Sequence, residues 1–117
     1  MNGYFGLLLQ EVPPMFGTVA KMKLKPGSFE KMQETMSEFE GQQAKGFVST
    51  IVYRSQADPN EAWLAIVFED EASYRANSDD PRTNEMSRNL QELLAAPPEW
   101  HDGEVVNMTR AGETASA

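Results

Sequence analysis

His101 is the only histidine of this 117-residue chain, and it stands between Trp100 and Asp102. An imidazole with an ordinary pKa of about 6.5 changes its charge close to neutral pH, which makes it the first choice for a general base. The neighbouring carboxylate could pair with the ring. The same residue also fits an exposed loop ahead of the last strand, with no chemical role. Both interpretations stay open, and we take His101 as a candidate catalytic residue.

Aromatic side chains with a polar tip form the second candidate set. A flat aromatic ligand could stack on such rings or form hydrogen bonds with their polar atoms. They could equally pack in the core or against a second subunit. Arg75 and Asn77 follow one of them and could orient a carbonyl or a carboxylate at a pocket mouth. The set is Tyr74, taken as a catalytic candidate, with Tyr53, Trp63 and Trp100 as candidates for substrate binding.

Methionine is abundant, with seven copies in the chain. Flexible thioether side chains adapt to apolar ligands, although such residues more often fill a core. Met22, Met32, Met36 and Met86 are predicted to point between the helices and the sheet. We include Met22 and Met86 as candidates for substrate binding, together with Phe39 and Phe68.

Composition excludes several classes of function. The chain has no cysteine, which rules out disulfides and thiolate chemistry and is compatible with the cytoplasm. No metal-binding motif such as HExxH or an EF-hand occurs, so we expect no metal site. A net charge of −8 would repel nucleic acid and anionic lipid. No apolar run reaches the roughly 20 residues that a membrane-spanning helix needs.

The most apolar stretch runs from Gly46 to Glu69 and predicts a β-hairpin. Its strands, Phe47–Arg54 and Ala62–Glu69, are rich in β-branched and aromatic residues. The loop between them contains Asp58-Pro59-Asn60, which is typical of a turn. We expect this hairpin to lie in the middle of the sheet.

Alternation over Phe16–Leu24 predicts a first strand, and Ser28 can cap a helix that reaches Gln43. Phe29, Met32, Met36, Phe39 and Gln43 recur at helical spacing along that helix.

Two further helices are predicted after the hairpin. Asp70 can cap Glu71–Asn77, and Asp80 followed by Pro81 can start the second helix. The buried stripe of this second helix is Met86, Leu90, Leu93 and Leu94. A last strand is expected over Gly103–Met108.

The resulting order, β-α-β-β-α-β, predicts an α+β ferredoxin-like fold with helices on one face of a four-stranded antiparallel sheet. Each hairpin strand is apolar on both sides, so the other sheet face needs cover, and a second copy of the chain would supply it as a homodimer. We expect the domain to span residues 15–108 and the tail 109–117 to be disordered. Residues 1–14 fit either an ordered arm or an over-extended start, with Met15 as the initiator.

Three stretches resemble the antibiotic biosynthesis monooxygenase domain of the dimeric α+β barrel superfamily: MFGTVAKMKLKPGSFEKMQETMSEF, GFVSTIVYRS and AWLAIVFEDEASYRANSDDP. The resemblance rests on Lys25-Pro26-Gly27-Ser28-Phe29, on Gly46, and on Phe68-Glu69 followed by Asp70-Glu71-Ala72-Ser73-Tyr74. It covers about Met15 to Met108. It implies a homodimer whose protomers each hold a pocket between sheet and helices.

Family members include cofactor-independent monooxygenases that oxidise aromatic polyketides or quinols, and others that degrade haem. In the haem-degrading branch the resemblance would place an asparagine, a tryptophan and an axial histidine at Met22, Phe68 and Met86, and all three depart from that pattern. The expected function is therefore cofactor-independent oxidation of a small apolar or aromatic molecule. A non-catalytic ligand-binding or stress-response domain and a small-ring isomerase or lyase are the alternatives.

Overall fold

The computed structural model describes residues 12–40 and 44–112, without the side chains of residues 39 and 40. Its four-stranded sheet has the order β2-β3-β1-β4, and all neighbours are antiparallel. The strands are β1 (Phe16–Lys23), β2 (Phe47–Arg54), β3 (Glu61–Phe68) and β4 (Glu99–Glu104). The predicted ferredoxin-like fold is confirmed.

The expected central position of the hairpin is wrong for β2, which is an edge strand. The centre is formed by β3 and β1, because β1 pairs with β3 along one side and with β4 along the other. This edge strand is apolar on both faces. Phe47 and Val52 pack against the core, whereas Ile51 points away from the helices and is 52% exposed on the uncovered face.

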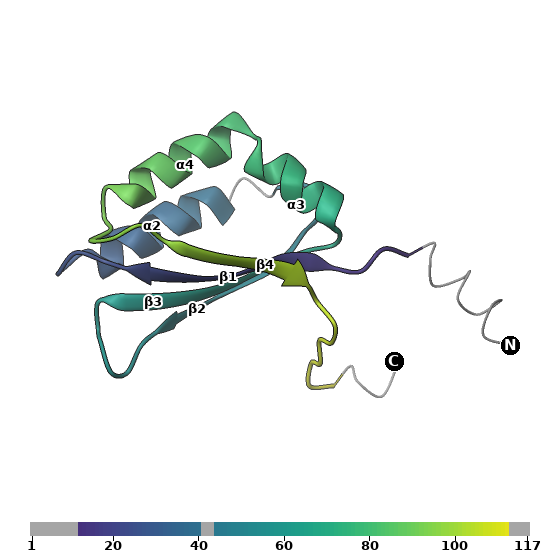
Figure 1. Ribbon diagram of the computed structural model, residues 1–117, viewed down its shortest axis with the longest axis horizontal. Helices are drawn as coiled ribbons and strands as arrows, with labels where there is room; N and C mark the ends of the chain where they lie inside the picture. The colour runs from purple at the N-terminus through teal and green to yellow at the C-terminus, as the bar shows by residue number, and fades with distance from the viewer. Residues whose placement is uncertain (1–11, 41–43, 113–117) are drawn as a thin grey trace, which may run out of the picture.

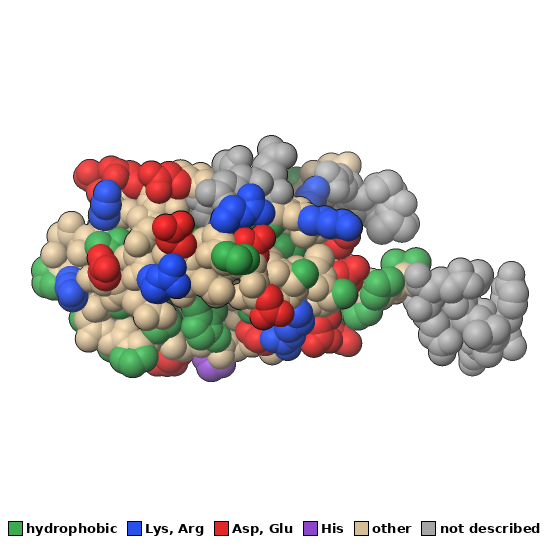
Figure 2. Space-filling model, turned by 90° about the horizontal axis from the view of Figure 1, so that it is seen from above, with side chains coloured by type: hydrophobic (Ala, Val, Ile, Leu, Met, Phe, Trp, Pro, Cys, Tyr) green, Lys and Arg blue, Asp and Glu red, His purple; other side chains and the backbone are tan. Residues whose placement is uncertain are grey.

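The three helices within the described residues cover the same face of the sheet (Figure 1). They are α2 (Phe29–Glu40), α3 (Glu71–Ser78) and α4 (Pro81–Gln91). The predicted caps are confirmed: the Asp70 carboxylate accepts from the Ser73 amide, and that of Asp80 accepts from the Arg82 amide. Acidic and basic side chains are spread over this side of the molecule, as Figure 2 shows.

The last strand lies earlier in the chain than the predicted Gly103–Met108. Its pairing with β1 begins at Glu99 and ends where Glu104 meets Phe16, the first residue of β1. The β-prone residues Val105 and Val106 therefore lie beyond the end of their partner strand and form no strand of their own. Trp100, His101 and Asp102 consequently belong to a strand, and their side chains alternate between its two faces.

The core lies between the sheet and the helices. As the alternation in β1 predicts, every second residue from Phe16 to Met22 lies on this side, and Met22, Met32, Leu64 and Phe68 are its largest fully buried side chains. At the far end, the backbone of residues 93–95 pairs with residues 23–25 of the β1 end. This pairing fixes the end of α4 against the sheet.

Most of the proposed arm, residues 1–11, and the end of the tail, residues 113–117, lie outside the described residues. In the part that is described, no helix is both long enough and apolar enough to cross a membrane.

Candidate functional site

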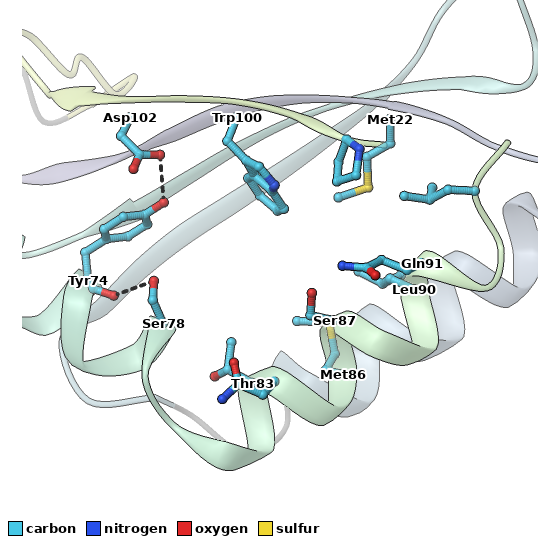
Figure 3. A pocket seen from close by; sticks show the side chains of 13 residues that line it. Met22, Tyr74, Ser78, Thr83, Met86, Ser87, Leu90, Gln91, Trp100 and Asp102 are labelled. Carbon is cyan, nitrogen blue, oxygen red and sulfur yellow. Dashed lines mark hydrogen bonds between the residues drawn. The ribbon is translucent and has the colours of Figure 1, made fainter. Parts of the chain in front are cut away.

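A pocket with a volume of about 300 Å³ opens between β4 and the helices α3 and α4. Figure 3 shows side chains from the sheet pointing toward side chains from both helices across this space. The described residues that line it are Met22, Tyr74, Ser78, Thr83, Asn84, Met86, Ser87, Leu90, Gln91, Leu94, Pro98, Trp100 and Asp102.

One part of the pocket is apolar. Met22, Leu90 and Leu94 are almost fully buried and form its floor, with Met86 packed beside them. The ring of Trp100 projects from β4 and is 49% exposed, so one side of it remains available to a ligand. An aromatic ring between a tryptophan and methionine side chains would bury its faces on both sides.

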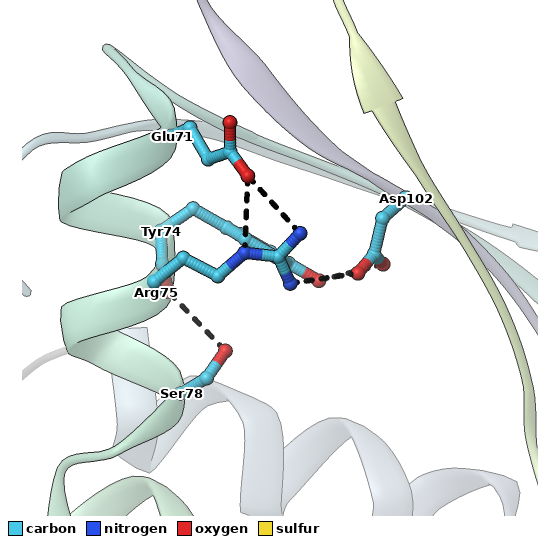
Figure 4. A network of polar contacts seen from close by, with 5 residues as sticks. All are labelled: Glu71, Tyr74, Arg75, Ser78 and Asp102. Carbon is cyan, nitrogen blue, oxygen red and sulfur yellow. Dashed lines mark hydrogen bonds and ion pairs between the residues drawn. The ribbon is translucent and has the colours of Figure 1, made fainter.

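The other part is polar and contains a hydrogen-bonded pair. The Tyr74 hydroxyl donates to Asp102 Oδ1 at 2.9 Å. Arg75 Nη1 donates to the second oxygen of the same carboxylate at 3.1 Å, and the guanidinium also contacts Glu71 Oε2 at 3.2 Å (Figure 4). Two of these residues, Tyr74 and Asp102, line the pocket, while Arg75 and Glu71 hold the pair from the solvent side.

Burial, reinforced by the hydrogen bond to Asp102, raises the pKa of Tyr74 to about 12. Partial burial by itself would raise the pKa of Asp102, but its hydrogen bonds outweigh this and hold that pKa below the ordinary value. The Thr18 hydroxyl lies close enough to Asp102 to help lower its pKa. Its buried oxygen nevertheless has no partner at hydrogen-bonding geometry. At neutral pH the pocket therefore presents a neutral phenol beside an ionised carboxylate.

Tyr74 is positioned by its packing rather than by the hydrogen bond alone. Its ring is 9% exposed and lies 5.3 Å from the ring of Phe16 and 5.8 Å from that of Phe68, measured between centroids. Both contacts have the tilted or edge-on geometry that aromatic pairs prefer. The guanidinium of Arg75 covers the Phe16 and Tyr74 rings at 5.2 and 5.4 Å. The phenol therefore has little freedom to move away from Asp102.

The pocket brings together some of the residues named from the sequence. Met22, Tyr74, Met86 and Trp100 line it. Phe68 does not, because it is buried behind Tyr74 in the aromatic cluster. The side chain of Phe39 lies outside the described residues. Asn77 is not among the lining residues, and its side-chain oxygen accepts from the Thr83 hydroxyl at 3.1 Å, which ties α3 to α4.

The remaining candidates, Tyr53, Trp63 and His101, lie on the opposite face of the sheet. His101 pairs across β1 with Val19, and its ring is exposed, with Glu99 as a neighbour at 3.9 Å. Trp63 donates to Glu61 at 2.7 Å and lies under the Lys21 ammonium, and Tyr53 is 60% exposed. The pairing of His101 with Asp102, which the sequence left open, is absent, since neighbours along a strand point to opposite faces.

Sequence reasoning missed two contributions to the pocket. Asp102 was considered only as a partner for His101, and the polar face of α4 (Thr83, Asn84, Ser87 and Gln91) was not considered at all. The spacing of the α4 residues is the signal that could have found them. They recur at positions that share one side of a helix, beside the apolar stripe.

In residues 12–40 and 44–112, no three histidine, aspartate or glutamate side chains gather into a set that could hold a metal ion. Asp102 is the one carboxylate among the described residues that line the pocket.

Fold and pocket together define a ferredoxin-like α+β protein that can enclose a small, mainly apolar molecule. The profile of the antibiotic biosynthesis monooxygenase family matches residues 15–86, and the chain belongs to this family. No curated protein matches the chain.

Solved structures with the same fold come from several organisms. A candidate antibiotic biosynthesis monooxygenase from Chloroflexus aurantiacus is 24% identical, with a TM-score of 0.70, over 84% of this chain and 99% of its own. A conserved protein from Methanosarcina mazei is 19% identical, with a TM-score of 0.70, over 83% and 97%. A mutant form of SnoaB, a cofactor-independent oxygenase from Streptomyces nogalater, is 13% identical, with a TM-score of 0.72, over 81% and 96%.

Proposed function

We propose that the protein is a cofactor-independent monooxygenase that acts on a hydroxylated aromatic molecule in the pocket between β4 and α4. The observation that carries the proposal is the Tyr74–Asp102 pair at the polar end of a pocket whose other end is formed by Trp100 and methionines. Family membership and the likeness to SnoaB support it.

In this proposal, Asp102 accepts a proton from the substrate hydroxyl. Asp102 is ionised, and each of its oxygens can accept more than the one hydrogen bond it has from Tyr74 or Arg75. Because its pKa is low, it is a weak base for an intact phenol. Proton transfer to Asp102 is therefore coupled to electron loss, since a phenol that has given an electron to oxygen is far more acidic.

The overall reaction balances without an external reductant. A methylene group of an anthrone-like substrate becomes a carbonyl, one oxygen atom of O₂ enters the product, and the other leaves as water with the two hydrogens. All four electrons that O₂ accepts come from the substrate. The protein's part is to bind the ring, hold the hydroxyl and exclude water from the apolar end.

Tyr74 orients the base and stays neutral, because its pKa of about 12 keeps the proton on the phenol at working pH. Its oxygen donates to Asp102 and can still accept a hydrogen bond from the substrate. In this proposal the catalytic role expected of His101 passes to Asp102, and Tyr74 keeps a place in the site.

Oxygen uptake by the metal-stripped protein, with a panel of hydroquinones and anthrone-like phenols, tests the function. Asp102→Asn is isosteric and removes the proton acceptor, so we expect at least about a tenfold loss of turnover. Tyr74→Phe is expected to have a smaller effect. Absence of uptake with every compound, together with binding of some, would favour the non-catalytic alternative.

We also propose that the protein forms a homodimer through the uncovered sheet face. Val19, Ile51 and Tyr53 are each about half exposed or more on that face, beside Trp63 and Val67. A contiguous apolar sheet face of this kind favours self-association. The cytoplasm stays the expected location.

A further inference from the structure

In the part of the chain that the structure describes, the pocket lining carries a negative charge and no positive charge, and this affects which ligands can bind. Of the described residues that line it, Asp102 is the one with a charge at neutral pH, and none is lysine, arginine or histidine. The other polar side-chain groups there are neutral: hydroxyls, amides and the indole N–H of Trp100. The ligand thus meets one negative charge at the polar end and none of opposite sign on the lining.

Arg75 does not cancel this charge. Its guanidinium contacts Asp102 at 3.1 Å, but it also contacts Glu71 at 3.2 Å, so one cation is shared by two carboxylates. The Glu71–Arg75–Asp102 group has a net charge of −1. Figure 4 shows Arg75 between the two acidic side chains, occupied on both sides. Its donors are directed at those carboxylates rather than into the pocket.

We propose that Asp102 makes this pocket selective for neutral ligands bearing a hydroxyl, and that it excludes ligands of the same shape bearing a carboxylate. The inference rests on the proposed function for the choice of pocket, but it concerns binding and requires no turnover. A hydroxyl donates to the free lone pairs of Asp102. A carboxylate at the same position has no proton to donate and is repelled by a like charge in a site of reduced dielectric.

The apolar end sets the shape of the ligand that can reach Asp102. Met22, Leu90 and Leu94 are buried and offer no polar partner, whereas Trp100 offers a ring face. A flat ligand of two or three fused rings suits a cavity of about 300 Å³. Its apolar rings would occupy that end, leaving its substituent at the Tyr74–Asp102 pair.

2-Naphthol and 2-naphthoic acid form a matched pair for the test, because they share the ring system and differ in charge at neutral pH. Titration calorimetry gives the two dissociation constants. The two tryptophan indole N–H signals in ¹H–¹⁵N spectra report the place of binding, since Trp100 lines the pocket and Trp63 lies on the other sheet face. We expect the naphthol to shift the Trp100 signal alone, and the naphthoate to bind at least about tenfold more weakly.

Two variants separate Asp102 from its surroundings. Asp102→Asn removes the charge at the ligand, so the naphthoate should bind within about threefold of the naphthol. Glu85→Gln also removes one negative charge, but from an exposed position of α4 that neither lines the pocket nor contacts Arg75, so most of the selectivity should remain. The comparison in the unaltered protein does not depend on either variant folding.

Equal binding of naphthol and naphthoate by the unaltered protein would overturn the inference, as would binding of neither. Equal relief by both variants would also overturn it, because the selectivity would then belong to the field of the whole acidic surface. Naphthol selectivity without oxygen uptake would leave the inference standing while the proposed function fails. Oxygen uptake together with equal binding of naphthol and naphthoate would support the proposed function and overturn the inference.

Discussion

Both faces of the sheet carry apolar side chains, but they differ in what covers them. On the inner face the helices bury Met22, Leu64 and Phe68 to 1% exposure each. On the outer face Val19 and Ile51 are 48% and 52% exposed. Apolar residues that alternate along the strands thus fall into two groups. Those on the inner face form the core and the pocket, and those on the outer face form the proposed dimer surface.

The same comparison separates the two groups of candidate residues. Trp100 and Asp102 point toward the helices and line the pocket, whereas His101 between them points the other way. A shift of one residue along β4 would have reversed this arrangement. Register, and not residue type, therefore decides which side chain can take part in the proposed chemistry.

The largest expected effect is on the inner face. Phe68→Ala removes a side chain that is 1% exposed and contacts the rings of Phe47 and Tyr74. We expect the free energy of unfolding to fall by about 3–5 kcal/mol, measured by urea denaturation. Val106→Ala is the control, since Val106 is 91% exposed and should change stability by no more than about 0.5 kcal/mol. Similar losses for both variants would contradict the described core.

The next effect is on the outer face. Ile51→Asp places a charge on the proposed dimer surface, where association would bury it without a partner. Light scattering after size-exclusion chromatography should show a monomer in place of a dimer, with circular dichroism unchanged. Ser37→Asp adds the same charge to an exposed position of α2 and should leave the dimer intact. A dimer that persists in Ile51→Asp would assign the outer face another role.

A smaller effect is expected at alkaline pH. The neutral form of Tyr74 is favoured in the folded protein, whose pKa for this group is about 12 against an ordinary value of 10.0. Its stabilising contribution is therefore complete below pH 10 and is lost as the pH rises toward 12. Tyr74→Phe should lower the free energy of unfolding by about 1 kcal/mol at neutral pH and remove this alkaline dependence. Ultraviolet absorbance of tyrosinate and denaturation at several pH values measure both.

Much of the fold could be predicted from the sequence, because local patterns determine it. Alternation identified the helix-facing residues of β1, and Asp70 and Asp80 marked two helix starts. The error at β4 has a physical cause. Glu99–Glu104 is mostly polar and exposed, and it becomes a strand because it pairs with the backbone of β1. The more β-prone Val105 lies past the end of β1, and its amide donates to the Met15 carbonyl at 2.9 Å without extending the strand.

The site was less predictable than the fold for the same reason. Whether Asp102 or His101 faces the pocket depends on the β4 register, which the sequence of β4 does not encode in an apolar pattern. Met22 and Met86 are candidates because they are predicted to point between helices and sheet, and Tyr74 and Trp100 because rings with a polar tip can bind a flat ligand; all four line the pocket. Neither criterion can tell a lining residue from one behind it, such as Phe68.

The smallest expected effect concerns His101. Since its ring lies on the outer face with Glu99 at 3.9 Å, His101→Ala should change naphthol binding and oxygen uptake by no more than about twofold. The same measurements on Asp102→Asn provide the contrast. A large loss in His101→Ala would not restore the histidine to the pocket of its own chain, because β1 and the sheet lie between them. It would instead show that the outer face, through a second subunit, contributes to the reaction, and Ile51→Asp should then abolish activity as well.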